Sequence, residues 1–380
     1  MNQTGSKNIS LILAASFFYM AGSMLVTPLI VGFSAQSGAS ATLAGTIGGL
    51  MNLCSLFCRP AVGNLADRVS KYRLSMIGAG MMALACAGYM LAQRAWVIVL
   101  ARIANGLGFA CCSVCMSTWM SSLLPKEQIG SGMGLYGTMN ALAMAVAPAA
   151  GVRVYQLAGY RTAFGIALAC AVLTGVIIQF VPDRGLPERS AVRTRPQLAD
   201  RRVLPISLII MLFAIPYCAT QSYLISYTQA RLLSVSVSLF FPFYAAVLLT
   251  LRLSLRRLFD RLPFRRFLFA GAASALAAIG LLSEMKSNAL LLLAAAFMAG
   301  GYGVMCSVCQ STAIVLAGKE HRGLANSTYY IGLDLGMTLG PFLGGLLYGR
   351  ADIRLFYPAL LLTVPAALLV YFLSRRTSRL

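Results

Sequence analysis

Charged side chains are scarce in this sequence. They make up 11% of its 380 residues, whereas hydrophobic residues make up 59%. A soluble domain of this length does not need so much apolar sequence, so the composition indicates a membrane protein. Because a membrane-spanning helix needs about 20 apolar residues, the chain has room for roughly twelve such helices. That leaves no room for a soluble catalytic domain.

Histidine and acidic residues are rarer still. The chain contains one histidine and ten aspartates and glutamates, so its apolar segments hold no clustered histidines or paired acids of the kind that a membrane enzyme would use. No G-x-x-x-x-G-K followed by Ser or Thr is present, which argues against an ATP-binding loop. We therefore expect no enzymatic activity and no cofactor.

Four of the ten cysteines form two Cys-x-x-Cys pairs, Cys112 with Cys115 and Cys306 with Cys309. Two thiols on one helix face can bind a soft metal. The alternative is that they are small residues at close helix contacts, and the lack of an accompanying histidine favours this alternative. We therefore predict no metal site.

Basic residues outnumber acidic residues by 31 to 10, which gives a net charge of +21. A nucleic-acid-binding protein carries such charge on a water-exposed face, whereas here the basic residues lie between apolar runs. This spacing argues against nucleic acid as a partner. It makes the lipid bilayer the expected environment.

Apolar runs separated by charged or glycine- and proline-rich breaks predict twelve membrane spans. The first run is too long for a secretory signal peptide and is interpreted as a span. The predicted spans are residues 9–33, 41–64, 74–92, 96–123, 131–156, 161–181, 203–228, 233–255, 267–283, 288–317, 323–349 and 353–373.

The distribution of lysine and arginine predicts the orientation of the spans. Of the 31 basic residues, 23 lie at the two termini and in or beside the loops on the same side, and 7 lie on the opposite side. Basic residues accumulate on the cytoplasmic side of membrane proteins. We therefore expect a multi-pass protein of the inner (cytoplasmic) membrane of a cell, with both termini in the cytoplasm.

The longest polar stretch, residues 183–202, divides the chain into nearly equal parts. We interpret it as a cytoplasmic linker between an N-terminal six-helix half, residues 1–182, and a C-terminal six-helix half, residues 203–380. Two halves with an even number of spans have the same topology and are related by a pseudo-two-fold axis along the membrane normal.

Three internal matches support this division. They occur at nearly one spacing, which is typical of a duplicated half and of the parallel repeats found in facilitator transporters. The matches are residues 59–73 with 252–266 and Pro148 with Pro341, both at an offset of 193, and residues 112–118 with 306–312 at an offset of 194.

Several motifs resemble those of the major facilitator superfamily, and the resemblance extends over the whole chain. Residues 63–68, GNLADR, are similar to the family signature G-x-L-A-D-R-x-G-R-K, although Ser70, Lys71 and Tyr72 depart from it. Residues 102–108 resemble the R-x-x-x-G-x-G pattern of span 4. The resemblance implies an all-α membrane protein with the major facilitator fold and 12 transmembrane helices.

A further element, G-P-x-x-G-G, is associated with the proton-antiporting, exporting branch of this family. The match to this element is partial in span 5 and complete in span 11. The sequence therefore resembles the twelve-span drug and sugar efflux permeases of bacteria. The residues that we assign to this helix-packing motif are Pro148, Gly151, Gly340, Pro341 and Gly344.

Asp67 lies in the loop after span 2, at the same predicted side as the beginning of span 11. A helix N-terminus carries partial positive charge, so a carboxylate against it can latch the cytoplasmic side. The alternative is a loop acid that is satisfied by its basic neighbours. The residues assigned to this gating motif are Arg59, Gly63, Asp67, Arg68, Asp260 and Arg261.

Asp334 is the only acid in the middle of a predicted span. Such a residue costs about 2.5 to 3.5 kcal/mol to insert, which suggests a function or a partner. It shares a helical face with Asn326 and Tyr330, at spacings of four residues. We consider it a candidate proton carrier or a group that binds a cationic substrate. The alternative is a neutral acid that hydrogen-bonds a neighbouring helix.

Arg102 is the only base inside a predicted span. It can counter an anionic substrate or act on a nearby carboxylate; equally, it can bind backbone carbonyls or an acid as a structural group. Polar residues that can line a central cavity, or else pack between helices, come from spans that the resemblance places there. They are Tyr19, Asn105, Gln221, Tyr223 and Tyr330.

The function predicted from these features is secondary active transport. The favoured hypothesis is export of a small organic solute in exchange for protons, by alternating access of the two halves, with the chain acting as a monomer. One alternative is a proton-linked importer or uniporter of a sugar or metabolite. An alternative of another class is a membrane sensor or scaffold that keeps the carrier fold without transporting.

Overall fold

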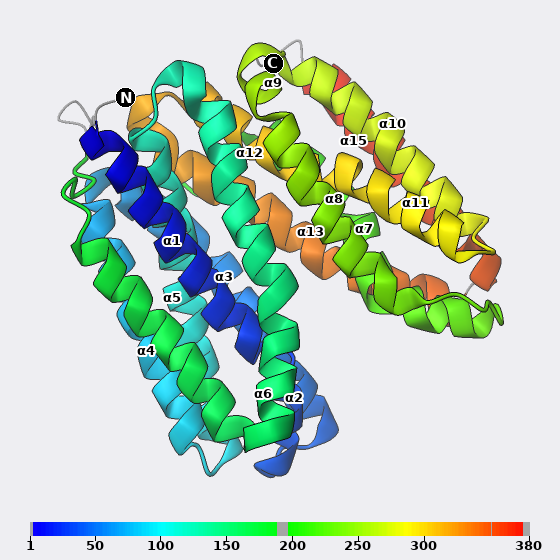
Figure 1. The fold of residues 1–380 in the computed structure, drawn as a ribbon, viewed down its shortest axis with the longest axis horizontal. Helices are drawn as coiled ribbons and strands as arrows, with labels where there is room; N and C mark the ends of the chain where they lie inside the picture. Colours follow the sequence, from blue (N-terminus) through cyan, green and yellow to red (C-terminus); the bar gives the residue numbers. More distant parts are fainter. Residues whose placement is uncertain (1–2, 188–196, 351, 375–380) are drawn as a thin grey trace. The chain divides into compact units, whose positions relative to one another are not determined.

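The computed structural model describes residues 3–187, 197–350 and 352–374. Within those ranges the regular structure is entirely helical, as Figure 1 shows, which confirms the predicted all-α fold. The helices are α1 (Gln3–Val26), α2 (Ile30–Gln36), α3 (Ala41–Arg68), α4 (Lys71–Leu91), α5 (Ala95–Ser122), α6 (Ile129–Gln179), α7 (Leu204–Ala230), α8 (Phe240–Ser254), α9 (Arg256–Arg261), α10 (Phe264–Ser283), α11 (Asn288–Met298), α12 (Val304–Ala317), α13 (Arg322–Arg350), α14 (Phe356–Leu361) and α15 (Thr363–Ser374).

Ten segments of the described chain are long and apolar enough to cross a membrane. One of them, Lys126–Gln179, contains two predicted spans, because α6 is interrupted at Gly159, whose φ of 79° and ψ of 176° are not helical. The 28-residue α3 is not among the ten, but it covers the predicted span 41–64. With α3 included and the two parts of α6 counted separately, each of the twelve predicted spans corresponds to helix in the described chain.

The chain folds into two compact units. The first contains Met1–Pro125, Tyr136–Leu198 and Gly318–Ser327, and in it α5 packs against α1, α3 and α4. The second contains Lys126–Leu135, Ala199–Ala317 and Thr328–Leu380, and in it α7 packs against α12 and α15, and α10 against α11. The first unit thus includes the beginning of α13, whose remainder belongs to the second unit. The second unit includes the beginning of α6, whose remainder belongs to the first. The division into six-helix halves on either side of residues 183–202 stays a prediction.

A row of glycines on α13 allows this helix to approach α7 closely. Gly332, Gly336 and Gly340 lie four residues apart and share one helix face. A Cβ at Gly336 would lie 2.6 Å from the carbonyl oxygen of Met211, and a Cβ at Gly340 would lie 2.7 Å from that of Ile215. Because real side chains do not come this close, only glycine allows the two backbones to pack at this distance.

The other residues of the predicted packing motif also lie at helix contacts or inside helices. In the first unit, a Cβ at Gly151 would lie 2.5 Å from the carbonyl oxygen of Leu25 in α1. In the second unit, a Cβ at Gly344 would lie 2.8 Å from the ring of Tyr223. Pro148 and Pro341 lie inside α6 and α13.

The described ends of the polar linker are bonded to helices. Lys71 donates its amide to the carbonyl of Gly185 at 2.9 Å, and the hydroxyl of Ser70 donates to the carbonyl of Arg184 at 2.6 Å, so the linker satisfies groups at the beginning of α4. Toward the other end, Asn64 and Gln197 exchange two hydrogen bonds. Residues 188–196 of the predicted linker lie outside the described residues.

The change in repeat offset from 193 to 194 has a structural cause. The helix α5 is continuous, whereas its counterpart consists of α11, a π-helical turn at Ala299–Gly303, and α12. A π turn accommodates one extra residue in a helix. The insertion therefore lies in this turn, and it moves the second Cys-x-x-Cys pair one position further along the chain.

Candidate functional site

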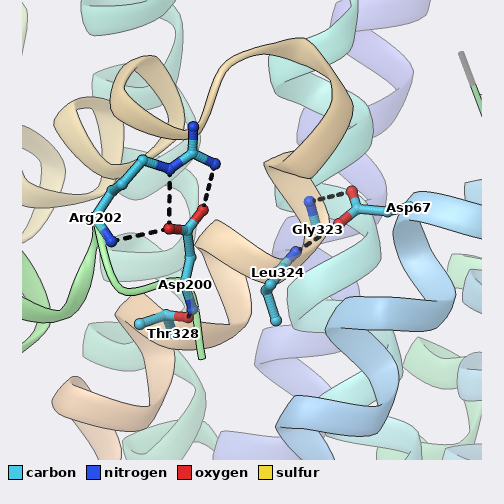
Figure 2. A network of polar contacts seen from close by, with 6 residues as sticks. All are labelled: Asp67, Asp200, Arg202, Gly323, Leu324 and Thr328. Carbon is cyan, nitrogen blue, oxygen red and sulfur yellow. Dashed lines mark hydrogen bonds and ion pairs between the residues drawn. The ribbon is translucent and has the colours of Figure 1, made fainter. Parts of the chain in front are cut away.

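Asp67, near the end of α3, binds the N-terminus of α13. Its Oδ1 accepts a hydrogen bond from the amide of Gly323 at 2.6 Å, and its Oδ2 accepts one from the amide of Leu324 at 2.9 Å (Figure 2). The first amides of a helix have no partner within the helix, and the helix dipole favours a negative charge there. The contact that the sequence suggested for this carboxylate is therefore present, within the first compact unit.

The position of Asp67 affects its protonation. The residue lies beyond the predicted span 41–64 and is partly buried, and desolvation raises its pKa from 3.8 to about 6. The amides of Leu324 and Gly323 oppose this rise, as do the charges of Lys71 and His321. The carboxyl group thus exchanges its proton closer to neutral pH than an ordinary aspartate does.

Glycines allow the two backbones to meet beside this carboxylate. A Cβ at Gly323 would lie 2.6 Å from the carbonyl oxygen of Gly63, and a Cβ at Gly63 would lie 2.5 Å from the Cβ of Ser327. The hydroxyl of Ser327 donates to the carbonyl of Arg59 at 2.5 Å. The glycine of the signature motif is therefore needed for the close approach of α3 and the beginning of α13.

The second compact unit contains a related contact. Asp260 accepts a hydrogen bond from the amide of Ser131 at 2.8 Å, near the beginning of α6. Asp260 and Ser131 correspond to Asp67 and Leu324 at the offset of 193. The two contacts are unequal, because Asp67 accepts two amide bonds and is partly buried, whereas Asp260 is exposed and has one such bond in the described chain.

The basic residues of the predicted gating motif occupy different environments. Arg59 is 1% exposed, and its Nη1 donates to the hydroxyl of Ser113 at 3.0 Å. Arg68 and Arg261 are exposed at the ends of α3 and α9. The structure therefore brings together Arg59, Gly63 and Asp67 around the beginning of α13, whereas Arg68 and Arg261 lie at the surface of their units.

Arg102 is buried and binds the backbone of α3. Its Nε donates to the carbonyl of Ile47 at 3.1 Å and its Nη2 to that of Gly48 at 2.7 Å, while Nη1 lies 3.6 Å from the sulfur of Met51. All three nitrogens of the guanidinium thus face α3. This geometry favours the structural interpretation of Arg102 over that of a substrate counter-charge.

Two of the predicted cavity residues form polar contacts in the first unit. Asn105 is buried on α5, and its amide nitrogen donates to the hydroxyl of Tyr89 at 3.3 Å. The hydroxyl of Tyr19, on α1, lies 3.2 Å from that of Tyr136. Both pairs join different helices, which is consistent with the packing alternative for these residues.

Asp334 lies in the middle of α13 and is partly buried. Tyr330, one turn earlier on the same face, is 8% exposed and accepts a hydrogen bond from Gln310 of α12 at 3.1 Å. Tyr223 packs against Tyr348 and is partly buried, whereas Gln221 is exposed. In the second unit, therefore, Asp334 and Tyr330 share one side of α13, whereas Tyr223 and Gln221 lie on α7.

Sequence reasoning missed some residues of this region. The amides of Gly323 and Leu324 were not named, although Lys126, Glu127 and Gly130 repeat as Lys319, Glu320 and Gly323 at the offset of 193 and mark the same turn in both copies. Asp200 was also missed. It binds the side chain of Arg202 at 2.8 Å, and its amide donates to the hydroxyl of Thr328 at 2.9 Å (Figure 2). No sequence signal identified this second group.

Residues 12–304 and 257–380 match the Major Facilitator Superfamily. An uncharacterized MFS-type transporter of Bacillus subtilis, YfiU, is 30% identical over 131 residues, and another of Mycobacterium tuberculosis, Rv1250, is 27% identical over 116 residues. These alignments cover 34% and 30% of this chain, but only 25% and 20% of the two relatives.

Solved structures share the fold over almost the whole chain. The human organic anion transporter MFSD10 (TETRAN) has a TM-score of 0.80 at 15% identity and covers 96% of this chain and 99% of its own. FucP in its outward conformation has a TM-score of 0.78 at 16% identity, with 99% and 100% covered. A bacterial homologue of the iron transporter ferroportin has a TM-score of 0.77 at 15% identity, with 96% and 98% covered.

The family match extends over most of the chain, whose described part is helical and includes ten segments that could cross a membrane. The chain belongs to the major facilitator superfamily.

Proposed function

We propose that this facilitator exports a small organic solute in exchange for protons. The observation that supports this most is Asp334, the one acid in the interior of a candidate span of the described chain. It is partly buried on the face of α13 that carries Tyr330, which is hydrogen-bonded to α12. A carboxyl group at such a depth can take up a proton on one side of the membrane and release it on the other.

The contact of Asp67 with α13 would act as the gate on the cytoplasmic side. A carrier that works by alternating access must form and break contacts at each of its two ends. The bonds from Gly323 and Leu324, which lie within the first unit, would close one such end. They are charge-assisted bonds when Asp67 is ionised, and such bonds can hold a conformation without covalent linkage. The orientation of this end toward the cytoplasm rests on the distribution of basic residues.

The membrane potential can drive such an exchange. A potential of about 100 mV supplies about 2.3 kcal/mol per charge moved, which can sustain a gradient of roughly fifty-fold. The fold leaves the substrate open, since it is shared by an organic anion transporter, by FucP and by a homologue of an iron transporter. The proposal therefore rests on residues of this chain.

Proton release in everted vesicles tests the proposal. A pH-sensitive dye would report proton movement when anionic, cationic, zwitterionic and sugar substrates are added to vesicles with the native chain or with Asp334→Asn. We expect release with at least one substrate and loss of that release in the variant. Release that survives in Asp334→Asn would exclude Asp334 as the carrier, and the absence of release with every substrate would contradict proton exchange.

A further inference from the structure

A buried arginine in the second compact unit has unpartnered donors. Arg252, near the end of α8, is 6% exposed. Its Nη2 donates to the carbonyl of Gly303 at 2.9 Å, whereas its Nε and Nη1 have no hydrogen-bond partner among the described residues. An arginine side chain does not lose its charge in proteins, and a buried charge without a counter-charge is costly. A buried guanidinium of this kind favours an anionic partner.

The π-helical turn accounts for these free donors. In the first unit, Arg59 corresponds to Arg252 at the offset of 193, and it donates to the hydroxyl of Ser113. Beyond the inserted residue, the counterpart of Ser113 is Ser307, whose hydroxyl is buried and has no partner in the described chain. The arginine of the second copy instead binds Gly303, in the π turn itself. The first unit thus has a hydrogen bond between Arg59 and Ser113, whereas the corresponding atoms of Arg252 and Ser307 have no partner in the described chain.

Tyrosines from α8, the π turn and α13 lie near the guanidinium. The ring of Tyr217, on α7, stacks on that of Tyr302 at 4.3 Å and lies 5.1 Å from that of Tyr244, on α8. Tyr244, Tyr302, Tyr329 and Cys306 lie within electrostatic range of Arg252. Tyrosine rings offer apolar surface, and their hydroxyl groups can form hydrogen bonds with a ligand.

We propose that Arg252 binds the carboxylate of the transported solute, which is an organic anion with an aromatic or aliphatic body. This inference rests on the proposed transport function and specifies its substrate class. A carboxylate supplies both the negative charge and the acceptors that Nε and Nη1 lack. The tyrosine rings bind the apolar body, as in most small-molecule sites, where a few polar groups fix the orientation of the ligand.

Binding of labelled benzoate and hexanoate to the full-length chain in detergent tests this assignment. We expect saturable binding that neutral benzamide and cationic benzylammonium do not displace. Arg252→Gln should abolish it, Arg252→Lys should weaken it, and Arg231→Gln, a matched change elsewhere in the same unit, should leave it unchanged. The assignment is overturned if neither acid binds the native chain, if benzamide competes as well as benzoate, or if Arg252→Gln binds like the native protein.

A second measurement needs no substitution at the arginine. Cys306 is partly exposed beside the guanidinium, and Cys54, also partly exposed, lies in α3 of the first unit. At twice its Kd, benzoate should slow alkylation of Cys306 by N-ethylmaleimide about threefold, whereas alkylation of Cys54 should not change. Equal rates at Cys306 with and without bound benzoate would place the binding site elsewhere.

Failure of the substrate assignment and failure of proton exchange give different results. If benzoate binds through Arg252 but none of the tested solutes releases protons from everted vesicles, proton exchange fails and the substrate assignment stands. If protons are released only by neutral or cationic solutes and benzoate does not bind, the substrate assignment fails and proton exchange stands.

Discussion

The carboxylate of Asp67 and the amide of Gly323 lie 2.6 Å apart although 256 positions separate them in the chain. The second oxygen of the same carboxylate binds Leu324. This arrangement holds the end of α3 against the beginning of α13. Its counterpart at Asp260 has one amide bond in the described chain and is exposed, so the two copies of one motif provide a matched pair for experiments.

Replacement of Asp67 by alanine should destabilise the protein more than the same change at Asp260. At pH 5, we expect Asp67→Ala to lower the free energy of unfolding by about 2 kcal/mol, because two helix amides lose their acceptor in a partly buried place. Asp260→Ala should cost less than about 1 kcal/mol, since its single bond is exposed. Thermal or urea unfolding in detergent measures both. Equal losses would show that the burial of Asp67 contributes nothing.

The advantage of Asp67 over alanine should decrease as the pH rises. Its pKa is raised to about 6 in the folded chain, so the folded chain binds more protons than the unfolded chain between about pH 4 and pH 6. The stabilisation is therefore complete below pH 4 and is lost as the pH passes 6. Between pH 5 and pH 7 the difference between native and Asp67→Ala should shrink by about 1 kcal/mol.

A control for this pH dependence is a variant that removes one of the positive charges near Asp67. Lys71 and His321 both act to lower the pKa of Asp67, so His321→Gln should move the transition to slightly higher pH. A difference between native and Asp67→Ala that stays constant from pH 4 to pH 8 would contradict the raised pKa.

Addition of a methyl group to the glycine row of α13 should be costly. A Cβ at Gly336 would lie 2.6 Å from the carbonyl oxygen of Met211, so Gly336→Ala should force α7 and α13 apart and lower stability by about 1 to 3 kcal/mol. The control is Gly280→Ala in α10, where nothing lies within 4 Å and the change should stabilise by about 0.4 to 1 kcal/mol. Melting temperatures that fall equally in both variants would argue against close packing at α13.

Arg102→Gln should separate the two interpretations of this arginine. If the guanidinium serves to bind the carbonyls of Ile47 and Gly48, its loss should lower the free energy of unfolding by about 2 kcal/mol or more and leave the half-saturation concentration of the substrate unchanged. A rise in the half-saturation concentration for anionic substrates at unchanged stability would instead indicate a counter-charge.

Much of the fold follows from the sequence. Apolar runs of about 20 residues can hydrogen-bond their backbone in a bilayer only as helices or closed barrels, so hydropathy predicts the number and approximate position of the spans. Helix boundaries are harder to predict from the sequence. In α6, a single residue with positive φ, Gly159, separates two spans without a loop.

The polar partners were harder to predict. The repeat indicated that Asp67 and Asp260 have related surroundings, but how deeply each is buried depends on how closely the neighbouring helices approach. That distance is set by glycines such as Gly63 and Gly323. Arg102 could be assigned to two roles with equal weight, because a sequence does not show which carbonyls lie within reach of a long side chain. Arg252 begins the repeated segment 252–266, but its lack of partners could not be predicted, since the π turn beside it has no recognised sequence signal.

The extra residue in the π turn also affects the spacing between the two copies of the repeat. The offset between the two copies is 193 at Asp260, 194 at Cys306 and 193 again from Lys319 onward, so the second copy has one residue fewer between Thr312 and Lys319. The gain and the loss cancel within a few turns of helix. The two copies thus differ in the middle of this span, whereas the number of residues from Asp67 to the beginning of α6 is the same as that from Asp260 to the beginning of α13. The two copies therefore keep the same spacing between the residues of the two carboxylate contacts. They differ in the partners of Arg59 and Arg252, which lie at the changed part of the span.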